Sequence, residues 1–248
     1  MKNLFVACAF ACLLSTQTFA APQKKVAPKP ASAKAEPVRP SILYDFKGAR
    51  LGMTLAEVKA LPLPPEGNSS IYESKYIKYG PQGFICSSDQ YANGKQPSGF
   101  YLGETERVLG VVACQYGRVS AVTKDYASIH GSTIAIGGFV VSDVRYKFMD
   151  GRLYEISITG SKNALVDVLD GLNAKFGAPD KVVEDTTQNK AGATFPHSTH
   201  TWKNPAASIT VEAPWTRIDN MNVIFLSTEG ANRLAAKSQE LHPSASKM

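Results

Sequence analysis

The 248-residue chain contains only four cysteines, two tryptophans and few long apolar runs. The apolar run Leu4–Leu14 has eleven residues, well short of the roughly 20 that a membrane-spanning helix needs, and no later segment comes closer. The sequence also lacks a P-loop, a zinc-protease helix, a serine-hydrolase elbow and a dinucleotide-binding turn in a suitable context. We therefore expect no transmembrane segment, no cofactor and no locally encoded catalytic centre. A Ser–His–Asp arrangement stays open, because triads are assembled in space.

The first twenty residues, MKNLFVACAFACLLSTQTFA, have the layout of a secretory signal peptide. Lys2 precedes the apolar run, and small or polar residues lead up to Ala20, near which we expect cleavage. A lipoprotein leader is the weaker alternative, because the residues before Cys8 and Cys12 match its cleavage site poorly. The leader predicts a periplasmic or secreted protein.

Removal of residues 1–20 leaves Cys86 and Cys114 in a chain sent to an oxidising compartment. One disulfide between them is the simplest interpretation. Closing a loop of about 28 residues stabilises a fold by roughly 3–4 kcal/mol when the geometry is unstrained. The alternative, a pair of zinc ligands, lacks the close cysteine spacing of such sites.

Residues 21–40, APQKKVAPKPASAKAEPVRP, are rich in proline, lysine and alanine and contain no aromatic residue. Such a segment buries too little apolar surface to offset the entropy of ordering, so we expect a disordered tail. The tail has a net charge of +4, and Lys2 leaves with the leader, so residues 41–248 retain only +1 of the total +6. The folded part therefore gives no reason to expect nucleic acid. We expect this tail either to contact anionic lipid or cell-wall polymer, or to act as a solubilising spacer.

A short helix is predicted near residue 54. Thr54 and Glu57 have the spacing of a capping box, and Leu55, Val58 and Leu61 then fall on one helical face. Three prolines within residues 62–65 prevent the helix from continuing. A helix of two turns is not stable alone, so we expect this apolar face to hook the helix onto another layer.

Residues 84–158 alternate between strand patterns and turn residues. In the last hairpin, Val144, Tyr146 and Phe148 share a face, as do Tyr154, Ile156 and Ile158 on the partner strand. The two faces coincide only if the positions of paired residues sum to an even number. This parity predicts a three-residue loop, Met149-Asp150-Gly151, with Gly151 in the left-handed conformation, in place of a two-residue turn.

A second, longer helix is predicted over residues 165–176, with Gly177 at its C-cap and Pro179 beyond it. Strand patterns follow at STHTWK, ASITVEA and MNVIFLS, and a last helix begins near Ser227 or Thr228 and runs to about Leu241. Residues 41–248 are therefore predicted to form an α+β domain of antiparallel sheet packed against a few helices. Its halves, 41–160 and 161–241, have similar helix endings, EVKALPLP and LNAKFGAP, which raises the alternative of an internal duplication.

Three short motifs together carry a family resemblance. They are Gly52-Met53-Thr54 at a helix start, Gly177-Ala178-Pro179 after a helix, and Trp202 on a later strand. In these motifs, over roughly a third of its length, the chain resembles envelope proteins of the SmpA/OmlA outer-membrane assembly lipoprotein kind and the β-lactamase-inhibitor-protein-like fold that they share. It departs from them in Pro62, where the family tends to have glycine, in a strand-rich insert, and in lacking a lipid-accepting cysteine. The resemblance implies a binding or scaffolding module with no catalytic residues.

Two segments carry residue types that are enriched at binding sites. Trp215 and Arg217 lie in EAPWTRIDN, which we expect to be a loop between two strands. Tyr76 and Tyr79 lie among lysines in IYESKYIKYG, an aromatic and basic segment suited to sugar or peptide. Ordinary packing of these aromatic rings against the sheet is the alternative for each segment.

His197 and His200 form an HxxH pattern in a stretch that we interpret as a loop entering a strand. On a helix the two rings would share a face, but no third ligand is evident, so we expect no metal site. The predicted function is that of an exported, non-catalytic binding or scaffolding protein of the cell envelope, with an envelope protein or cell-wall polymer as its partner. The alternatives are an envelope hydrolase or metal-dependent enzyme that uses these histidines, and an inhibitor of an extracytoplasmic enzyme.

Overall fold

A computed structural model describes residues 42–64, 80–91, 94, 96–122, 127–132, 134–136, 139–141, 143–188 and 192–243. All of them belong to one compact unit, Val38–Met248. The expected leader, the expected tail and the candidate residues Tyr76 and Tyr79 lie outside the described residues.

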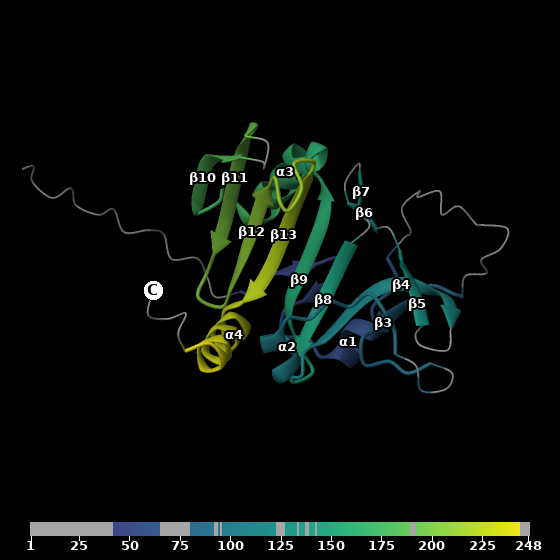
Figure 1. The fold of residues 1–248 in the computed structure, drawn as a ribbon. Coiled ribbons are helices and arrows are strands. Elements are labelled where there is room, and N and C mark those ends of the chain that lie inside the picture. Colours follow the sequence, from purple (N-terminus) through teal and green to yellow (C-terminus); the bar gives the residue numbers. More distant parts are fainter. Residues whose placement is uncertain are drawn as a thin grey trace, which may run out of the picture. The chain divides into compact units, whose positions relative to one another are not determined.

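A nine-stranded antiparallel sheet forms the body of this unit (Figure 1). The strand order is β10-β11-β12-β13-β9-β8-β4-β3, and β5 also pairs with β4. The strands are β3 (Gly83–Cys86), β4 (Val112–Val122), β5 (Ala127–Gly131), β8 (Asp143–Met149), β9 (Arg152–Ser161), β10 (Lys181–Gln188), β11 (Thr194–Lys203), β12 (Ala207–Ala213) and β13 (Asn220–Ser227). Two small ladders pair β1 (Asp45–Phe46) with β2 (Ala49–Arg50), and β6 (Ile134–Ile136) with β7 (Phe139–Val141). The α+β prediction is confirmed, and the sheet dominates the fold.

The helices are α1 (Leu55–Lys59), α2 (Glu104–Val108), α3 (Leu165–Phe176, after a 3-10 turn at Lys162–Ala164) and α4 (Thr228–Leu241). The second and last predicted helices are confirmed as α3 and α4. The helix α2 was not predicted, because it lies within residues 84–158, where only strands and turns were expected. In the part of the chain that the structure describes, no helix is both long and apolar enough to cross a bilayer.

One face of the sheet carries the main core, and α1 and α3 pack against it. The expected apolar residues of α3 are all part of this packing: Leu165, Val168, Leu169, Leu172 and Phe176. Trp202 on β11 is fully buried, and its indole N–H donates a hydrogen bond of 2.7 Å to the carbonyl of Gly177, at the C-cap of α3. This contact ties the end of α3 to the sheet and joins two of the motifs on which the family resemblance rests.

The short helix α1 is attached to the sheet at both its start and its apolar face. Its capping box is present, with Glu57 and Thr54 satisfying each other's backbone N–H groups. The N–H of Leu55 donates to the carbonyl of Gly151 in the β8–β9 turn at 3.0 Å, and Val58 has no exposed surface. The contacts explain how so short a helix is held in place: it is stabilised by packing onto the core.

The β8–β9 hairpin corrects one prediction. Val144 pairs with Ile158 and Tyr146 with Ile156, so the predicted even sum of positions is confirmed in the body of the hairpin. The loop itself has two residues, because Met149 pairs with Arg152, and both turn residues, Asp150 and Gly151, have positive φ. The register shifts between Lys147 and Phe148, so β9 holds an extra residue there. A bulge inside the strand therefore supplies the odd residue that we had placed in the loop.

The same bulge moves Tyr154 away from the face that the alternation predicted for it. Leu153 takes its place in the main core, while Tyr154 packs with Val111 and Met149 in a second cluster on the other side of the sheet. Leu234 of α4 joins this second cluster. The bulge thus provides the aromatic contact by which α4 packs against the end of the sheet.

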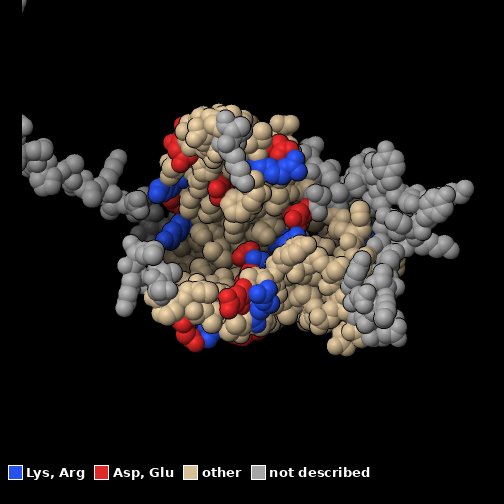
Figure 2. All heavy atoms as spheres, in the orientation of Figure 1, with Lys and Arg blue, Asp and Glu red and all other residues tan. Residues whose placement is uncertain are grey.

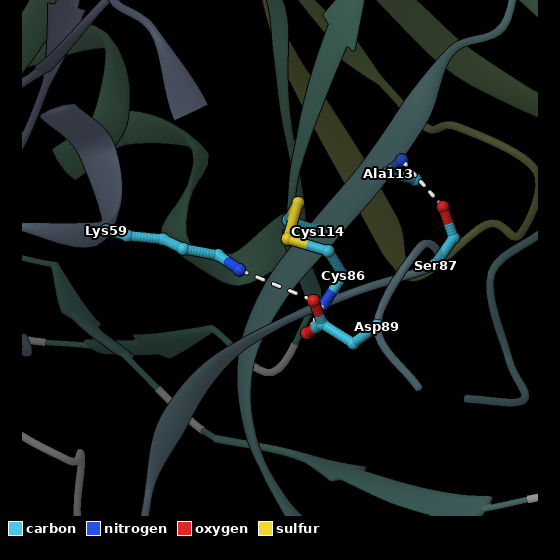
Figure 3. Close-up of a disulfide and its surroundings, with 6 residues drawn as sticks. All are labelled: Lys59, Cys86, Ser87, Asp89, Ala113 and Cys114. Carbon is cyan, nitrogen blue, oxygen red and sulfur yellow. Dashed lines mark hydrogen bonds and ion pairs between the residues drawn. A yellow bond between two sulfur atoms is a disulfide. The ribbon is translucent and has the colours of Figure 1, made fainter. Parts of the chain in front are cut away.

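The predicted disulfide is present between Cys86 on β3 and Cys114 on β4 (Figure 3). The two cysteines are direct cross-strand partners, and both are fully buried. Asp89 accepts a hydrogen bond of 2.8 Å from the backbone N–H of Cys86 and an ion pair of 3.3 Å from Lys59, the last residue of α1. The disulfide region therefore also links β3 to α1.

Candidate binding surface on the open face of the sheet

The face of the sheet that α1 and α3 do not cover is called here the open face. It consists of the side chains that alternate with the core residues along β8, β9, β13, β12 and β11. They include Asp143, Arg145, Lys147, Glu155, Ser157, Thr159, Asn222, Ile224, Leu226, Ser208, Thr210, Glu212, Phe195, His197, Thr199 and Thr201. Figure 1 views the sheet from this side, with α4 and α2 at its lower end, and Figure 2 shows a hollow in the same face with charges of both signs.

The open face carries an apolar residue flanked by hydroxyl groups. Ile224 lies on β13 between Thr210 on β12 and Ser157 on β9, in direct register with both. All three side chains are partly buried without being covered by a helix of the main core. Hydroxyls can donate and accept hydrogen bonds, so this arrangement suits a partner that presents backbone or side-chain polar groups around one apolar contact.

A half-buried charge network closes the lower end of the open face. The ammonium of Lys147 lies 2.7 Å from a carboxylate oxygen of Glu106 on α2 and 3.0 Å from one of Glu155 on β9. Exposure of the three side chains is only 17 %, 14 % and 14 %. The hydroxyl of Tyr154 donates to the same Glu106 oxygen at 3.1 Å. The network holds α2 against the sheet.

Burial and charge compete within this network. Partial burial lowers the pKa of Lys147, but the charges and hydrogen bonds of Glu155 and Glu106 outweigh it and raise the pKa overall. Burial raises the pKa of Glu155, and its ion pair with Lys147 offsets only part of that rise. Burial also acts to raise the pKa of Glu106, yet its hydrogen bonds with Lys147 and the Gly103 N–H lower it overall. Lys147 therefore stays charged and paired, which favours a structural role over general acid–base chemistry.

A second charge cluster lies at the other side of the open face. His197 on β11 sits between two carboxylates, with Nδ1 2.6 Å from Asp185 on β10 and Nε2 3.1 Å from Glu212 on β12. Desolvation lowers the pKa of His197, but its hydrogen bonds to Glu212 and Asp185 raise the pKa overall. The protonated ring donates to both carboxylates and so connects three strands.

Replacing His197 with Gln is expected to weaken the fold in a pH-dependent way. Because the folded pKa of His197 is raised above its ordinary value of 6.5, its stabilising contribution is complete below about pH 6.5 and is lost as the pH rises through the folded value. Urea unfolding of wild type and His197→Gln between pH 5 and pH 9 measures the difference in free energy of unfolding. That difference should be largest at the acid end; a difference that grows with pH would refute the charged bridge.

The two histidines of the HxxH pattern do not form one site. His197 faces the open side, whereas His200 is in register with the buried core residue Val211 and faces the other side of β11. Desolvation lowers the pKa of His200, only partly offset by Glu184. Among the residues that the structure describes, no group of three or more His, Cys, Asp or Glu could hold a metal ion. The two imidazole rings therefore point to opposite sides of β11 and cannot bind one metal ion together.

The loop that carries Trp215 and Arg217 joins β12 to β13, as expected. Trp215 is 37 % exposed, so its ring is neither fully packed nor fully free. Arg217 forms an ion pair with Asp219 at 3.2 Å, and most of its side chain is exposed. The structure leaves this loop as a second candidate contact, next to the end of the open face formed by β12 and β13.

Sequence reasoning missed the open face as a site, although part of its signal was visible. The alternation of Ser208, Thr210 and Glu212 with apolar residues indicates a strand with one polar face. The neighbours of that strand are set by non-local pairing, which the alternation does not specify.

Neither a family model, nor a curated protein, nor a solved structure matches this chain.

Proposed function

We propose that the protein is an exported, non-catalytic binding or scaffolding protein whose open face takes up a protein partner. The single observation that carries the proposal is that α1 and α3 leave this face free and that the half-buried Ile224 on it lies between Thr210 and Ser157, with paired charges on the same face. An apolar centre with a polar rim is the usual arrangement of a protein interface. The resemblance to envelope binding modules points the same way.

The charges of the open face favour a protein partner over a polyanionic polymer. The charged side chains on the face are matched by neighbours of opposite sign, as in Arg145 with Asp143 at 2.9 Å and Lys147 with Glu155. Balanced charge suits a mixed protein surface better than a polyanion.

Ile224→Lys is expected to abolish capture of the partner. A lysine at position 224 places a charge where a partner must bury an apolar contact, while its flexible stem can reach solvent and spare the fold. The measurement is affinity capture from an envelope extract of the host, quantified by mass spectrometry, with the wild type, Ile224→Lys and Val166→Lys. Val166, on α3 in the opposite layer, is 67 % exposed and provides the matched control.

Protein enriched by wild type and by Val166→Lys, and reduced at least tenfold with Ile224→Lys, would support the proposal. Thr210→Arg, which adds a large cation beside Ile224 from β12, serves as a second variant if Ile224→Lys unfolds. Equal capture by all variants would refute the open face as the site. Capture lost only in a Trp215→Ala, Arg217→Ala variant would move the site to the β12–β13 loop. If the captured protein is an enzyme that the chain inhibits, the inhibitor alternative is favoured.

A further inference from the structure

A separate cavity of about 200 Å³ lies on the core side of the sheet, under one edge of α3. Its floor is apolar and includes Ile158 on β9 with Val223 and Phe225 on β13. Phe46 on β1, Val141 on β7 and Met221 on β13 also line it. These residues belong to the face opposite the open face, so the cavity is distinct from the surface proposed above.

The edge of α3 that borders the cavity contains a glycine between two charged residues. Asp167, Gly171 and Lys175 are spaced one helical turn apart, and all three are exposed. A Cβ placed on Gly171 would meet no atom within 4 Å. Glycine inside a helix is less favourable than alanine, and here alanine would fit without a clash. The cavity is therefore open at Gly171 although a larger residue could close it.

The rim next to this opening is held by specific contacts. The ammonium of Lys175 donates to a carboxylate oxygen of Asp45 at 2.7 Å and to the Asp45 carbonyl at 3.4 Å. The same ammonium lies 5.1 Å from the centroid of the Phe176 ring. These contacts tie α3 to β1 across the cavity. The result is a preformed apolar pocket with a polar rim, which is the common construction of a small-molecule site.

We propose that this cavity binds the apolar part of a small molecule, namely one aromatic ring or a short alkyl group. An apolar cavity of about 150 Å³ is large enough to hold a benzene ring, so a cavity of about 200 Å³ can hold a ring with a few further atoms. The rim carries Lys47 and Lys175 with Asp45 and Asp167, so the charges balance and select no charged ligand. The ligand enters past Gly171, where no side chain blocks the cavity.

Titration with indole, followed by methyl NMR, tests this proposal. In the wild type we expect saturable shifts of the methyl groups of Ile158 and Val223, with a dissociation constant below about 1 mM. Gly171→Leu should fill the opening and weaken indole binding at least tenfold. The melting temperature should stay the same or rise by about 2–4 °C, because a helix-favouring residue replaces glycine.

Ala174→Leu adds the same side chain at an exposed position of the same helix and should leave indole binding unchanged. Gly171→Met, with a more flexible side chain, replaces Gly171→Leu if that variant fails to fold. The proposal is overturned if the wild type shows no saturable shift, if Gly171→Leu and Gly171→Met bind indole as the wild type does, or if the shifts occur at Ile224 on the open face instead.

Discussion

Val58→Asp is expected to lower the free energy of unfolding by about 4 kcal/mol or more, because it places an unpaired carboxylate in a fully buried position. In a domain of this size such a loss corresponds to a fall in melting temperature of about 8–16 °C. The large effect follows from the role of α1, which has five residues and is held mainly by its capping box and by its packing on the core. Thermal and urea unfolding followed by circular dichroism measure it.

Ala56→Asp is the matched control, because it introduces the same charge on the exposed side of the same helix. We expect it to change the free energy of unfolding by no more than about 0.5 kcal/mol. If Val58→Asp unfolds at the same temperature as Ala56→Asp, α1 is not a structural hook, and its sequence must serve some other purpose.

Loss of the disulfide is the second large effect. Replacing both Cys86 and Cys114 with Ala should lower the free energy of unfolding by about 3–4 kcal/mol, since the bond spans 28 positions and restricts the unfolded chain. Both sulfur atoms lie in the buried core, so the alanines also remove some packing. Urea unfolding of the oxidised wild type and of the double variant gives the difference.

Wild type treated with a reducing agent should unfold close to the double variant, because it loses the same constraint. A reduced wild type that is as stable as the oxidised protein would show that the cross-strand pairing of β3 and β4 holds this region without the bond. It would then also show that an oxidising compartment contributes little to folding.

The local sequence pattern was sufficient to predict an element whose own residues mark where it begins, which face is buried and where it ends. For α3, the apolar spacing from Leu165 to Phe176, with Gly177 after it, predicted both ends of the helix. The alternation in β8 and β9 predicted that Tyr146 and Ile156 share the buried face, although the predicted loop placed the pairing two residues away from the observed one. Both signals depend on residues that are close in the sequence.

Elements without such a signal were missed for identifiable reasons. The edge strand β10 is exposed along nearly all of its length, so it shows no alternation of apolar and polar residues. The helix α2 has only five residues and no buried side chain. Its position depends on the contact of Glu106 with Lys147, 41 residues away, which no local pattern encodes.

The candidate sites were predictable only in part, for the same physical reason. Trp215 and Arg217 were placed correctly in a loop, because residue type and flanking strands are local features. The open face requires the pairing of β9 with β13, and the cavity under α3 requires β1, β7 and α3 to meet. These contacts come from distant segments, so they appear only in the folded chain.

The two proposed sites lie on opposite faces of one sheet and can be tested apart. Ile224→Lys changes the open face, while Gly171→Leu changes the cavity under α3, and the two residues share no lining. Variants at one site should therefore leave binding at the other unchanged.

Site-specific photo-crosslinking tests the central claim of an open-face protein partner most directly. A photoreactive amino acid is introduced either at Thr210 on the open face or at Val166 on α3, in cells that produce the protein. The account predicts one discrete crosslinked product from Thr210 and none from Val166. A discrete product from Val166 with none from Thr210 would contradict it.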